Sequence, residues 1–220
     1  TGNDILNGGA GRDNLSGGAG IDTIDGGNDD DRILLSNGDF AAGESLTGGA
    51  GTDEIVLTNA TTVDFTTGTL ATIETLTGSS GNDDVTYTIQ QALNFTTIDL
   101  GTGTDNSRVN ITGTVDVTAL GTPTVFNAEN GYLTGSIGND DLTITGAQLD
   151  ALIFGGGTID FDTGADILNL TATSADLNML GLTDSSVLGL ETISVASAAA
   201  DTTITLSGQT EDFTITGSAN

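Results

Sequence analysis

The stretch GGAGRDNLS at residues 8–16 is followed directly by GGAGIDTID at residues 17–25. In both stretches two glycines come first, an aspartate stands sixth and a large aliphatic residue stands eighth. This strict period predicts a coiled all-β structure, in which each frame supplies a tight turn and then a strand of about three residues. The same aspartate also recurs on either side of these two stretches, so that aspartates stand every nine residues at Asp4, Asp13, Asp22 and Asp31.

Two frames make one coil of 18 residues. Asp4 is therefore expected to stack on Asp22 along one edge of the coils, at a spacing of about 4.8 Å. Asp13 is expected to stack on Asp31 along the other edge. The aliphatic residues of the four frames are expected to point inward: Leu6, Leu15, Ile24 and Ile33.

Stacked turns of this kind present carboxylates and backbone carbonyls to one ion. Calcium takes six to eight oxygen ligands at about 2.3–2.6 Å and tolerates irregular geometry, and glycine allows the positive φ that turns carbonyls inward. We therefore predict several bound calcium ions. The predicted ligands are the aspartates Asp4, Asp13, Asp22, Asp31, Asp53, Asp83, Asp105, Asp140 and Asp166 and the turn residues Gly8, Ala10, Gly17, Ala19, Gly26 and Asn28.

Beyond Ile33 the nine-residue interval breaks, and isolated frames follow whose matching aspartates are 52 to 61 residues apart. Asp53, Asp105 and Asp166 match one another in this alignment, and Asp83 matches Asp140. We divide the chain into a regular nonapeptide block at residues 1–34 and an irregular β-solenoid of three longer repeats at residues 35–220, continuous with the first. An isolated frame can also turn the chain without holding an ion. Alternating apolar and polar residues predict strands, and only the stretches from Gln90 and Ala147 predict short helices.

Other acidic residues in the longer repeats have different surroundings. Asp64, Asp116 and Asp176 have apolar neighbours, so we expect them to face solvent on a strand or to cap a turn. A second recurring set is expected to form an outer row of carboxylates: Glu74, Glu129 and Glu191.

The charge balance is strongly acidic, with 31 acidic side chains, three arginines, no lysine and no histidine, and a net charge of −28. Two carboxylates about 5 Å apart repel by roughly 3 kcal/mol at an effective dielectric constant near 20. Compaction therefore calls for cations. Because the chain has no basic patch, we expect no binding to nucleic acid or to anionic membrane surfaces. It also has no apolar run near 18 residues, so we expect no direct membrane insertion.

We expect no enzymatic activity. The chain has neither histidine nor cysteine, which removes an imidazole base and a thiol nucleophile, and no Gly-x-Ser-x-Gly motif occurs. Paired carboxylates such as Asp83-Asp84 could serve a glycosidase in principle. Adjacent residues on a strand point to opposite faces, however, which argues against that alternative.

The frames at residues 8–16, 17–25 and 48–56 resemble the calcium-binding nonapeptides of the repeats-in-toxin family of secreted bacterial proteins. The resemblance implies a right-handed parallel β-roll with calcium in its turns. It also implies export through a type I secretion channel, followed by folding outside the cell where calcium is millimolar. The longer repeats are similar, more loosely, to segments of giant surface-layer and adhesin proteins of the same secretion class.

Two functions are compatible with this pattern. The first is a structural module at the bacterial cell surface, which stiffens on extracellular calcium and associates with itself in a surface layer or filament. The second is an accessory calcium-dependent domain of a secreted enzyme or toxin, with a cell-surface polysaccharide as a partner. We favour the first, because the repeats are extended and rich in polar threonine faces.

Overall fold

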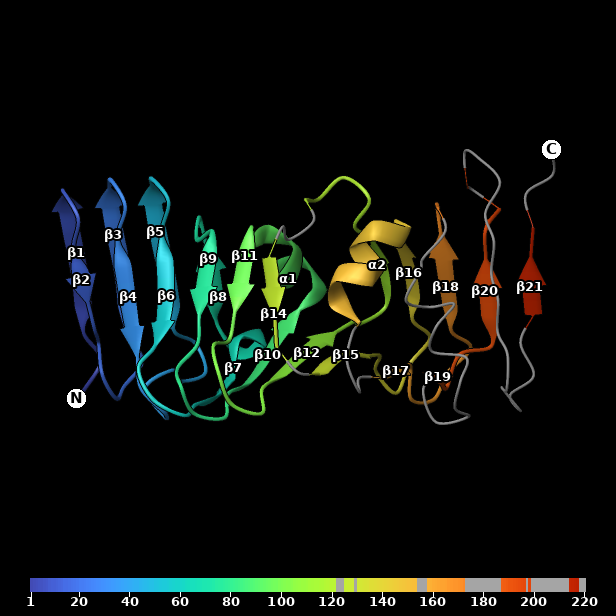
Figure 1. Ribbon diagram of the computed structural model, residues 1–220, viewed down its shortest axis with the longest axis horizontal. Helices are drawn as coiled ribbons and strands as arrows, with labels where there is room; N and C mark the ends of the chain where they lie inside the picture. Colours follow the sequence, from blue (N-terminus) through green and yellow to red (C-terminus); the bar gives the residue numbers. More distant parts are fainter. Residues whose placement is uncertain are drawn as a thin grey trace. The chain divides into compact units, whose positions relative to one another are not determined.

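The computed structural model describes residues 1–121, 125–128, 130–153, 158–172, 187–196, 198 and 214–217. Strands dominate these residues, and the strand pairs with defined registers are all parallel (Figure 1). The chain divides into two compact units, Thr1–Ser107 with Pro123–Ala128, and Arg108–Thr122 with Glu129–Asn220. Each unit is a stack of parallel β-coils, which confirms the predicted all-β solenoid.

The first unit is built from short strands with one 3-10 helix and one short α-helix. Its elements are β1 (Ile5–Ala10), β2 (Asn14–Leu15), β3 (Thr23–Asn28), β4 (Arg32–Leu35), β5 (Ser45–Ala50), β6 (Glu54–Leu57), β7 (Thr62–Asp64), the 3-10 helix η1 (Phe65–Thr67), β8 (Thr69–Ala71), β9 (Thr75–Thr77), β10 (Asp84–Thr88), α1 (Ile89–Asn94), β11 (Thr97–Asp99) and β14 (Val125–Asn127). Strand β12 (Asn106–Asn110) begins in this unit and ends in the second.

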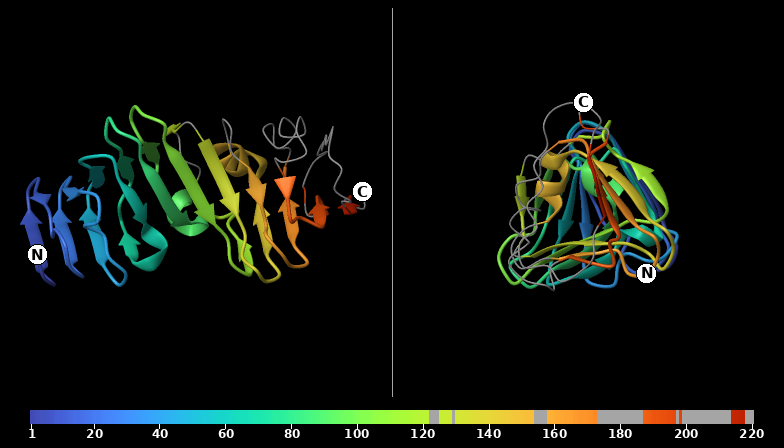
Figure 2. Two further views of the ribbon diagram at one scale, coloured as in Figure 1. Left: turned by 90° about the horizontal axis from the view of Figure 1, so that it is seen from below. Right: turned by 90° about the vertical axis from the view of Figure 1, so that its right-hand side faces the viewer.

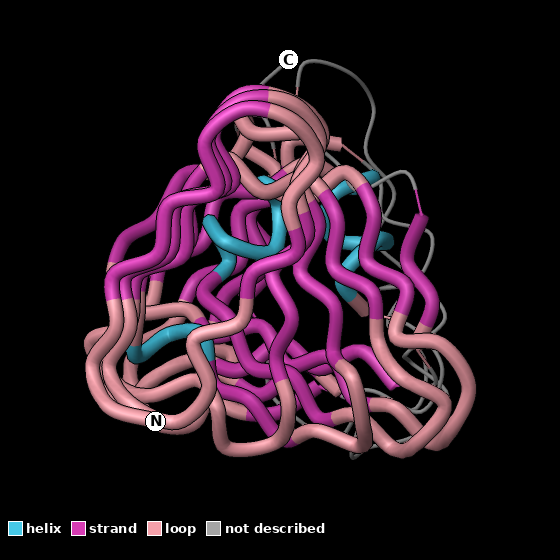
Figure 3. The backbone as a smooth tube through the Cα atoms, turned by 90° about the vertical axis from the view of Figure 1, so that its left-hand side faces the viewer, coloured by secondary structure: helices cyan, strands magenta, loops and turns pink. Residues whose placement is uncertain are grey.

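Successive coils of the first unit place their strands in columns. One sheet has the order β1-β3-β5-β8 and another the order β14-β11-β9-β6-β4-β2, while β7 pairs with β10 in a third (Figures 2 and 3). Like residues stack on like in these columns, since Ile24 pairs with Leu46 and Ile33 with Ile55. The predicted inward direction of Ile24 and Ile33 is confirmed, because both are buried. Leu6 and Leu15, on the first coil, are half-buried.

Close stacking also explains why the nonapeptide begins with two glycines. The second glycines of the frames that stack on three successive coils lie in register, at Gly9, Gly27 and Gly49. All three have positive φ, and a Cβ on Gly27 would lie only 2.2 Å from the Gly9 carbonyl oxygen. A side chain at this position is therefore excluded by both the backbone conformation and the neighbouring coil.

The second unit repeats the arrangement with a different set of strands. Its elements are β13 (Thr114–Asp116), β15 (Asn130–Thr134), β16 (Asp141–Ile144), α2 (Gly146–Leu152), β17 (Ile159–Asp160), β18 (Ile167–Leu170), β19 (Val187–Leu188), β20 (Thr192–Ser194) and β21 (Thr214–Thr216). One sheet has the order β13-β16-β18-β20-β21, and β15, β17 and β19 pair in a second. Its core includes the stacked residues Leu142, Leu168 and Ile193.

Both predicted short helices are confirmed. α1 and α2 each begin with a capping box, formed by Thr88 with Gln91 and by Thr145 with Gln148. Each of these glutamines also donates from Nε2 to backbone carbonyls outside its helix. No helix among the described residues is long and apolar enough to cross a membrane.

The sheets also show which frames share a column. Asp53 stands before β6, Asp105 before β12 and Asp166 before β18, and these strands belong to three different sheets. Residues in matching frames of the longer repeats therefore do not stack on one another. Stacked positions are closer in the sequence, 22 residues apart between Asp31 and Asp53 and 26 apart between Asp140 and Asp166.

Candidate metal centre

The predicted aspartates form ladders along the edges of the coils. Each of them occupies the position immediately before a strand. Except for Asp4 and Asp13 on the first coil, its Oδ1 accepts a hydrogen bond from the backbone N–H of the equivalent residue on the previous coil. The Asp4 N–H donates to Asp22 at 2.8 Å, and the Asp13 N–H donates to Asp31 at 2.8 Å. These bonds confirm both predicted stacking pairs. The second ladder continues from the Asp31 N–H to Asp53 at 2.8 Å.

Isolated frames of the longer repeats form the same kind of ladder. In the first unit the Asp83 N–H donates to Asp105 Oδ1 at 2.8 Å. In the second unit the Asp140 N–H donates to Asp166 Oδ1 at 2.7 Å. A frame that looks solitary in the sequence therefore has a partner on a neighbouring coil.

A second row of side chains runs in the opposite direction. Where an asparagine or aspartate precedes the ladder aspartate, its Oδ1 accepts a hydrogen bond from the equivalent N–H on the following coil. Thr104 N–H donates to Asn82 Oδ1 and Ala165 N–H donates to Asn139 Oδ1, both at 3.0 Å. These steps between coils therefore carry hydrogen bonds in both directions. The sequence analysis missed this role of asparagine, although its recurrence in Gly-Asn-Asp was the available signal.

The other carboxylate oxygen of several ladder aspartates has no hydrogen-bond partner. Among the described residues this applies to the Oδ2 atoms of Asp13, Asp22, Asp31, Asp53 and Asp166. These oxygens are buried, and the last four residues are at most 1% exposed. Burial of an uncompensated ionised carboxylate costs several kcal/mol. Each of the five positions therefore favours a positive charge beside it.

Glycines bring a backbone carbonyl to the same place. A Cβ on Gly26 would lie 2.5 Å from Asp31 Oδ2 and 2.5 Å from the Gly48 carbonyl oxygen on the next coil. A Cβ on Gly8 would lie 2.7 Å from Asp13 Oδ2 and 2.5 Å from the Gly26 carbonyl oxygen. The unpartnered carboxylate oxygen and a carbonyl of the next coil therefore converge where a side chain is missing.

The other four predicted turn ligands also belong to the nonapeptide block. Gly17 faces Asp22 Oδ2, which would lie 2.0 Å from a Cβ at that position. Ala10 and Asn28 stack in register at the ends of β1 and β3. The carbonyl of Ala19 accepts a hydrogen bond from the Gly2 N–H at 2.8 Å.

Asp83 and Asp140 differ from these five aspartates because protein donors satisfy both of their oxygens. Asp83 Oδ2 accepts from the Ser79 N–H at 2.8 Å and from its Oγ at 3.1 Å. Asp140 Oδ2 accepts from the N–H and Oγ of Ser136 in the same way. In both turns serine stands where the nonapeptide has its second glycine. The hydroxyl and amide of serine thus supply the compensation that the Gly-Gly turns lack.

Two glutamates that the sequence placed in an outer row also reach the ladders. Glu74 Oε2 accepts from the Asp53 N–H at 2.9 Å, and Glu191 Oε2 accepts from the Asp166 N–H at 2.6 Å. Glu44, which the sequence analysis missed, precedes β5 at the position equivalent to Asp22 and is buried. The signal was its place immediately before a strand.

The capping role expected of two other aspartates is confirmed. Asp64 caps η1 by accepting from the Thr66 N–H, and Asp116 accepts from the Thr118 N–H, each at 3.0 Å. Asp176 and Glu129 lie outside the described residues.

Burial changes the acidity of the ladder carboxylates. It raises the pKa of Asp53; the hydrogen bond from the Asp31 N–H opposes this, and the nearby charge of Glu74 adds to it. Burial and the Glu191 charge raise the pKa of Asp166 in the same way, against the hydrogen bond from the Asp140 N–H. The pKa of Glu44 rises to about 7, chiefly because the group is buried. In each case the folded protein disfavours the charged carboxylate, which a bound cation would reverse.

A metal site in this chain would have to combine carboxylate oxygens with backbone carbonyl oxygens. Among the residues that the structure describes, no group of three or more His, Cys, Asp or Glu side chains is placed to hold a metal ion. The oxygens that converge at the Gly-Gly turns are carboxylate and backbone carbonyl oxygens. Comparisons with family models, with curated proteins and with solved structures found no match to this chain.

Proposed function

We propose that this chain is a calcium-binding structural module of a secreted bacterial cell-surface protein, which folds and stiffens on extracellular calcium. The observation that carries the proposal is the set of buried Oδ2 atoms without hydrogen-bond partners, at Asp13, Asp22, Asp31, Asp53 and Asp166. Each one lies on a ladder between coils. A cation there compensates the carboxylate and links one coil to the next.

The ligand chemistry favours calcium over other common metals. The donors are carboxylate and carbonyl oxygens, and the chain contains neither histidine nor cysteine, the ligands that zinc prefers. Calcium accepts an irregular set of six to eight oxygens, whereas magnesium demands near-octahedral geometry and usually keeps several waters. A site assembled from two successive turns meets the calcium requirement better.

The same ladders couple metal binding to folding. With a net charge of −28, the metal-free chain repels itself, and the ladder carboxylates come together only when the coils stack. Calcium binds the stacked form in preference to the expanded one and so stabilises it. This coupling agrees with the type I secretion implied by the repeats-in-toxin resemblance, since such a chain would remain expanded until it met external calcium.

The proposal assigns different roles to the ladder aspartates. Those whose buried Oδ2 has no hydrogen-bond partner hold calcium through this oxygen, together with carbonyls of the adjacent turn. Asp83 and Asp140 instead link coils through Ser79 and Ser136. The module has no catalytic chemistry of its own in this proposal, and it contributes stiffness and self-association at the cell surface.

Calcium titration of metal-free protein tests the proposal. Far-ultraviolet circular dichroism should show a transition to β-structure, and small-angle scattering should show contraction from an expanded chain with a radius of gyration of roughly 50 Å. Magnesium at the same concentration serves as the control for ionic strength. A metal-free protein that is already β-rich at neutral pH, and that calcium leaves unchanged, would refute the proposal.

A further inference from the structure

A glutamate follows the last aspartate in three of the ladders. Glu44 follows Asp22 in the first sheet, Glu74 follows Asp53 in the second, and Glu191 follows Asp166 in the second unit. Where the next coil is described, its equivalent residue is not acidic: Gly68 comes after Glu44 and Thr96 after Glu74. Glutamate thus marks the point at which a column of carboxylates ends.

We call a step between coils a Gly-Gly step where one Gly-Gly turn stacks on another. The step from Asp53 to Glu74 has the features of a Gly-Gly step but is built differently. Asp53 is 1% exposed, and its Oδ2 has no hydrogen-bond partner. A Cβ on Gly48 would lie 2.6 Å from this oxygen and 2.1 Å from the Thr72 carbonyl oxygen. The two oxygens therefore converge on one point, as they do at Gly26. Here, however, the carbonyl comes from a threonine turn with a φ of 50°.

Glu74 contributes a second carboxylate to the same step. Its Oε2 accepts the hydrogen bond from the Asp53 N–H, and its charge is one cause of the raised pKa of Asp53. A second buried aspartate repeats this pairing in the other unit, where the Asp166 N–H donates to Glu191 and Asp166 Oδ2 lacks a hydrogen-bond partner. The arrangement is therefore a recurring feature of ladder ends.

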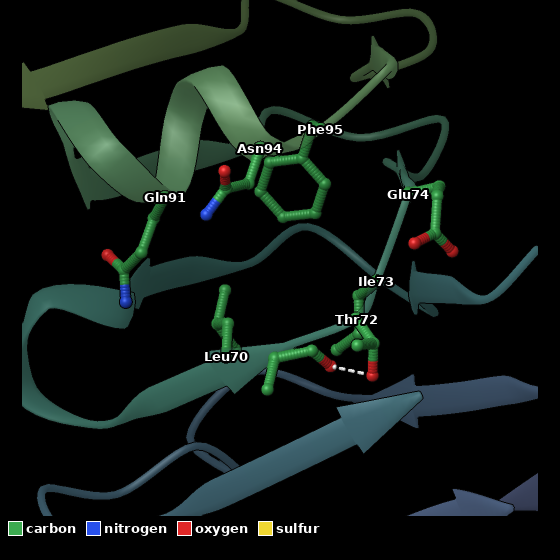
Figure 4. Close-up of a pocket in the computed structure, with 8 residues that line it drawn as sticks. Leu70, Thr72, Ile73, Glu74, Gln91, Asn94 and Phe95 are labelled. Carbon is green, nitrogen blue, oxygen red and sulfur yellow. Dashed lines mark hydrogen bonds between the residues drawn. The ribbon is translucent and has the colours of Figure 1, made fainter. Parts of the chain in front are cut away.

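A cavity lies beside the Glu74 end of the ladder. The sheet β1-β3-β5-β8 ends at β8, and the next coil carries α1 instead of another strand. Between them is a space of about 320 Å³, lined by the segment 70–74 and by Gln91, Asn94 and Phe95 (Figure 4). Thr72 and Glu74, which both belong to the ladder end, form part of this lining.

We propose that the step between Asp53 and Glu74 is a calcium site of a second kind, which opens into this cavity and keeps bound water there. Its protein ligands are Asp53 Oδ2, the Thr72 carbonyl and the Glu74 carboxylate. This inference rests on the proposed function, and it adds a ligand residue and a solvent-facing side that the Gly-Gly steps lack. Since water completes its coordination, the site binds calcium more weakly and exchanges it faster than the Gly-Gly steps.

Europium replaces calcium at oxygen sites, and its luminescence lifetimes in H₂O and D₂O count the water molecules bound to the ion. The wild-type protein should show a class of ions with few waters and a smaller class with more. Glu74→Gln keeps an oxygen that accepts from the Asp53 N–H but removes the charge. This variant should bind one calcium ion fewer per chain, or bind that ion with an affinity lower by roughly tenfold or more. It should also lack the class of europium ions with more bound waters.

Two further variants make the test specific. Glu54→Gln alters a glutamate on β6 that pairs with Arg32 outside the ladders, so it should leave the ion number and the hydrated class unchanged. Asn94→Phe narrows the cavity from α1 without touching a ligand, and it should reduce the number of bound waters at constant ion number. The Asn94 variant also tests the inference if Glu74→Gln does not fold.

The outcomes separate the two proposals. If the wild-type protein binds no calcium, the proposed function fails and this inference fails with it. If calcium binds but Glu74→Gln matches the wild type in both ion number and hydration, only the inference is overturned. Unchanged hydration in Asn94→Phe would likewise overturn the assignment of the cavity as the solvent-facing side.

Discussion

Asp31 and Asp83 stand in equivalent ladder positions, and we predict that changing each to asparagine has different consequences. Both accept a backbone hydrogen bond at 2.8 Å through Oδ1, and both are 1% exposed. They differ at Oδ2, which in Asp31 has no hydrogen-bond partner and in Asp83 accepts from Ser79. Asp31→Asn should therefore remove a calcium ligand, whereas Asp83→Asn should remove structural hydrogen bonds.

The magnitudes follow from these contacts. A site filled at a calcium concentration of 100 times its dissociation constant contributes about 2.7 kcal/mol to stability, and Asp31→Asn should forfeit about that amount in calcium. Without calcium the same change should favour the folded state, because each neighbouring carboxylate at about 5 Å opposes folding by up to roughly 3 kcal/mol. In Asp83→Asn the new side-chain NH₂ faces a backbone N–H, so that two donors meet without an acceptor. This lowers the free energy of unfolding by about 1–3 kcal/mol with or without calcium.

Equilibrium dialysis gives the number of ions bound, and circular dichroism gives the folded fraction in calcium and in metal-free buffer. Asp31→Asn should bind fewer ions than the wild type. In metal-free buffer it should have a larger folded fraction than the wild type. Asp83→Asn should bind the wild-type number once it is folded. Equal ion numbers in the two variants, or a loss of ions confined to Asp83→Asn, would refute the assignment of Oδ2 as the calcium ligand.

Two further predictions concern pH and packing. The pKa of Glu44 is raised in the folded state to about 7 from an ordinary value of 4.5. The contribution of Glu44 to stability is therefore complete below pH 4.5 and is lost as the pH rises through 7. Circular dichroism should show that metal-free protein loses β-structure over that pH range, and Glu44→Gln should make this loss less dependent on pH. Gly48→Ala would place a Cβ 2.1 Å from the Thr72 carbonyl oxygen, while the nearest atom to a Cβ on Gly138 is 3.7 Å away; thermal melts in calcium should show a loss of about 1–3 kcal/mol for the former and almost none for Gly138→Ala.

The nonapeptide block could be predicted almost completely from the sequence. Within it the turn, the strand and the next coil repeat at one interval, so the position of Asp13 over Asp31 follows from counting residues. The alternation of apolar and polar residues likewise places Ile24 and Ile33 inside, because residues i and i+2 of a strand lie on the same face. These features depend on local spacing alone.

The longer repeats were less predictable, since loops of different length decide which positions stack. Matching motifs placed Asp53, Asp105 and Asp166 in one alignment, yet each precedes a strand of a different sheet. Glu74 was expected on an outer row, but the coil brings its longer side chain to the Asp53 N–H. Such contacts join residues about 20 or more positions apart, and residue spacing does not encode them once the period is lost.

The sequence by itself determined that this chain winds into parallel β-coils with aspartates at the turns, because a strict period repeats the same local conformation on every coil. Only the tertiary structure decided which carboxylates are compensated by the protein and which are not. Asp31 and Asp83 belong to similar motifs, and their difference depends on whether a serine N–H and hydroxyl or a bare glycine faces the second oxygen. That distinction arises from packing in three dimensions, where hydrogen bonding and burial together set the cost of each charge.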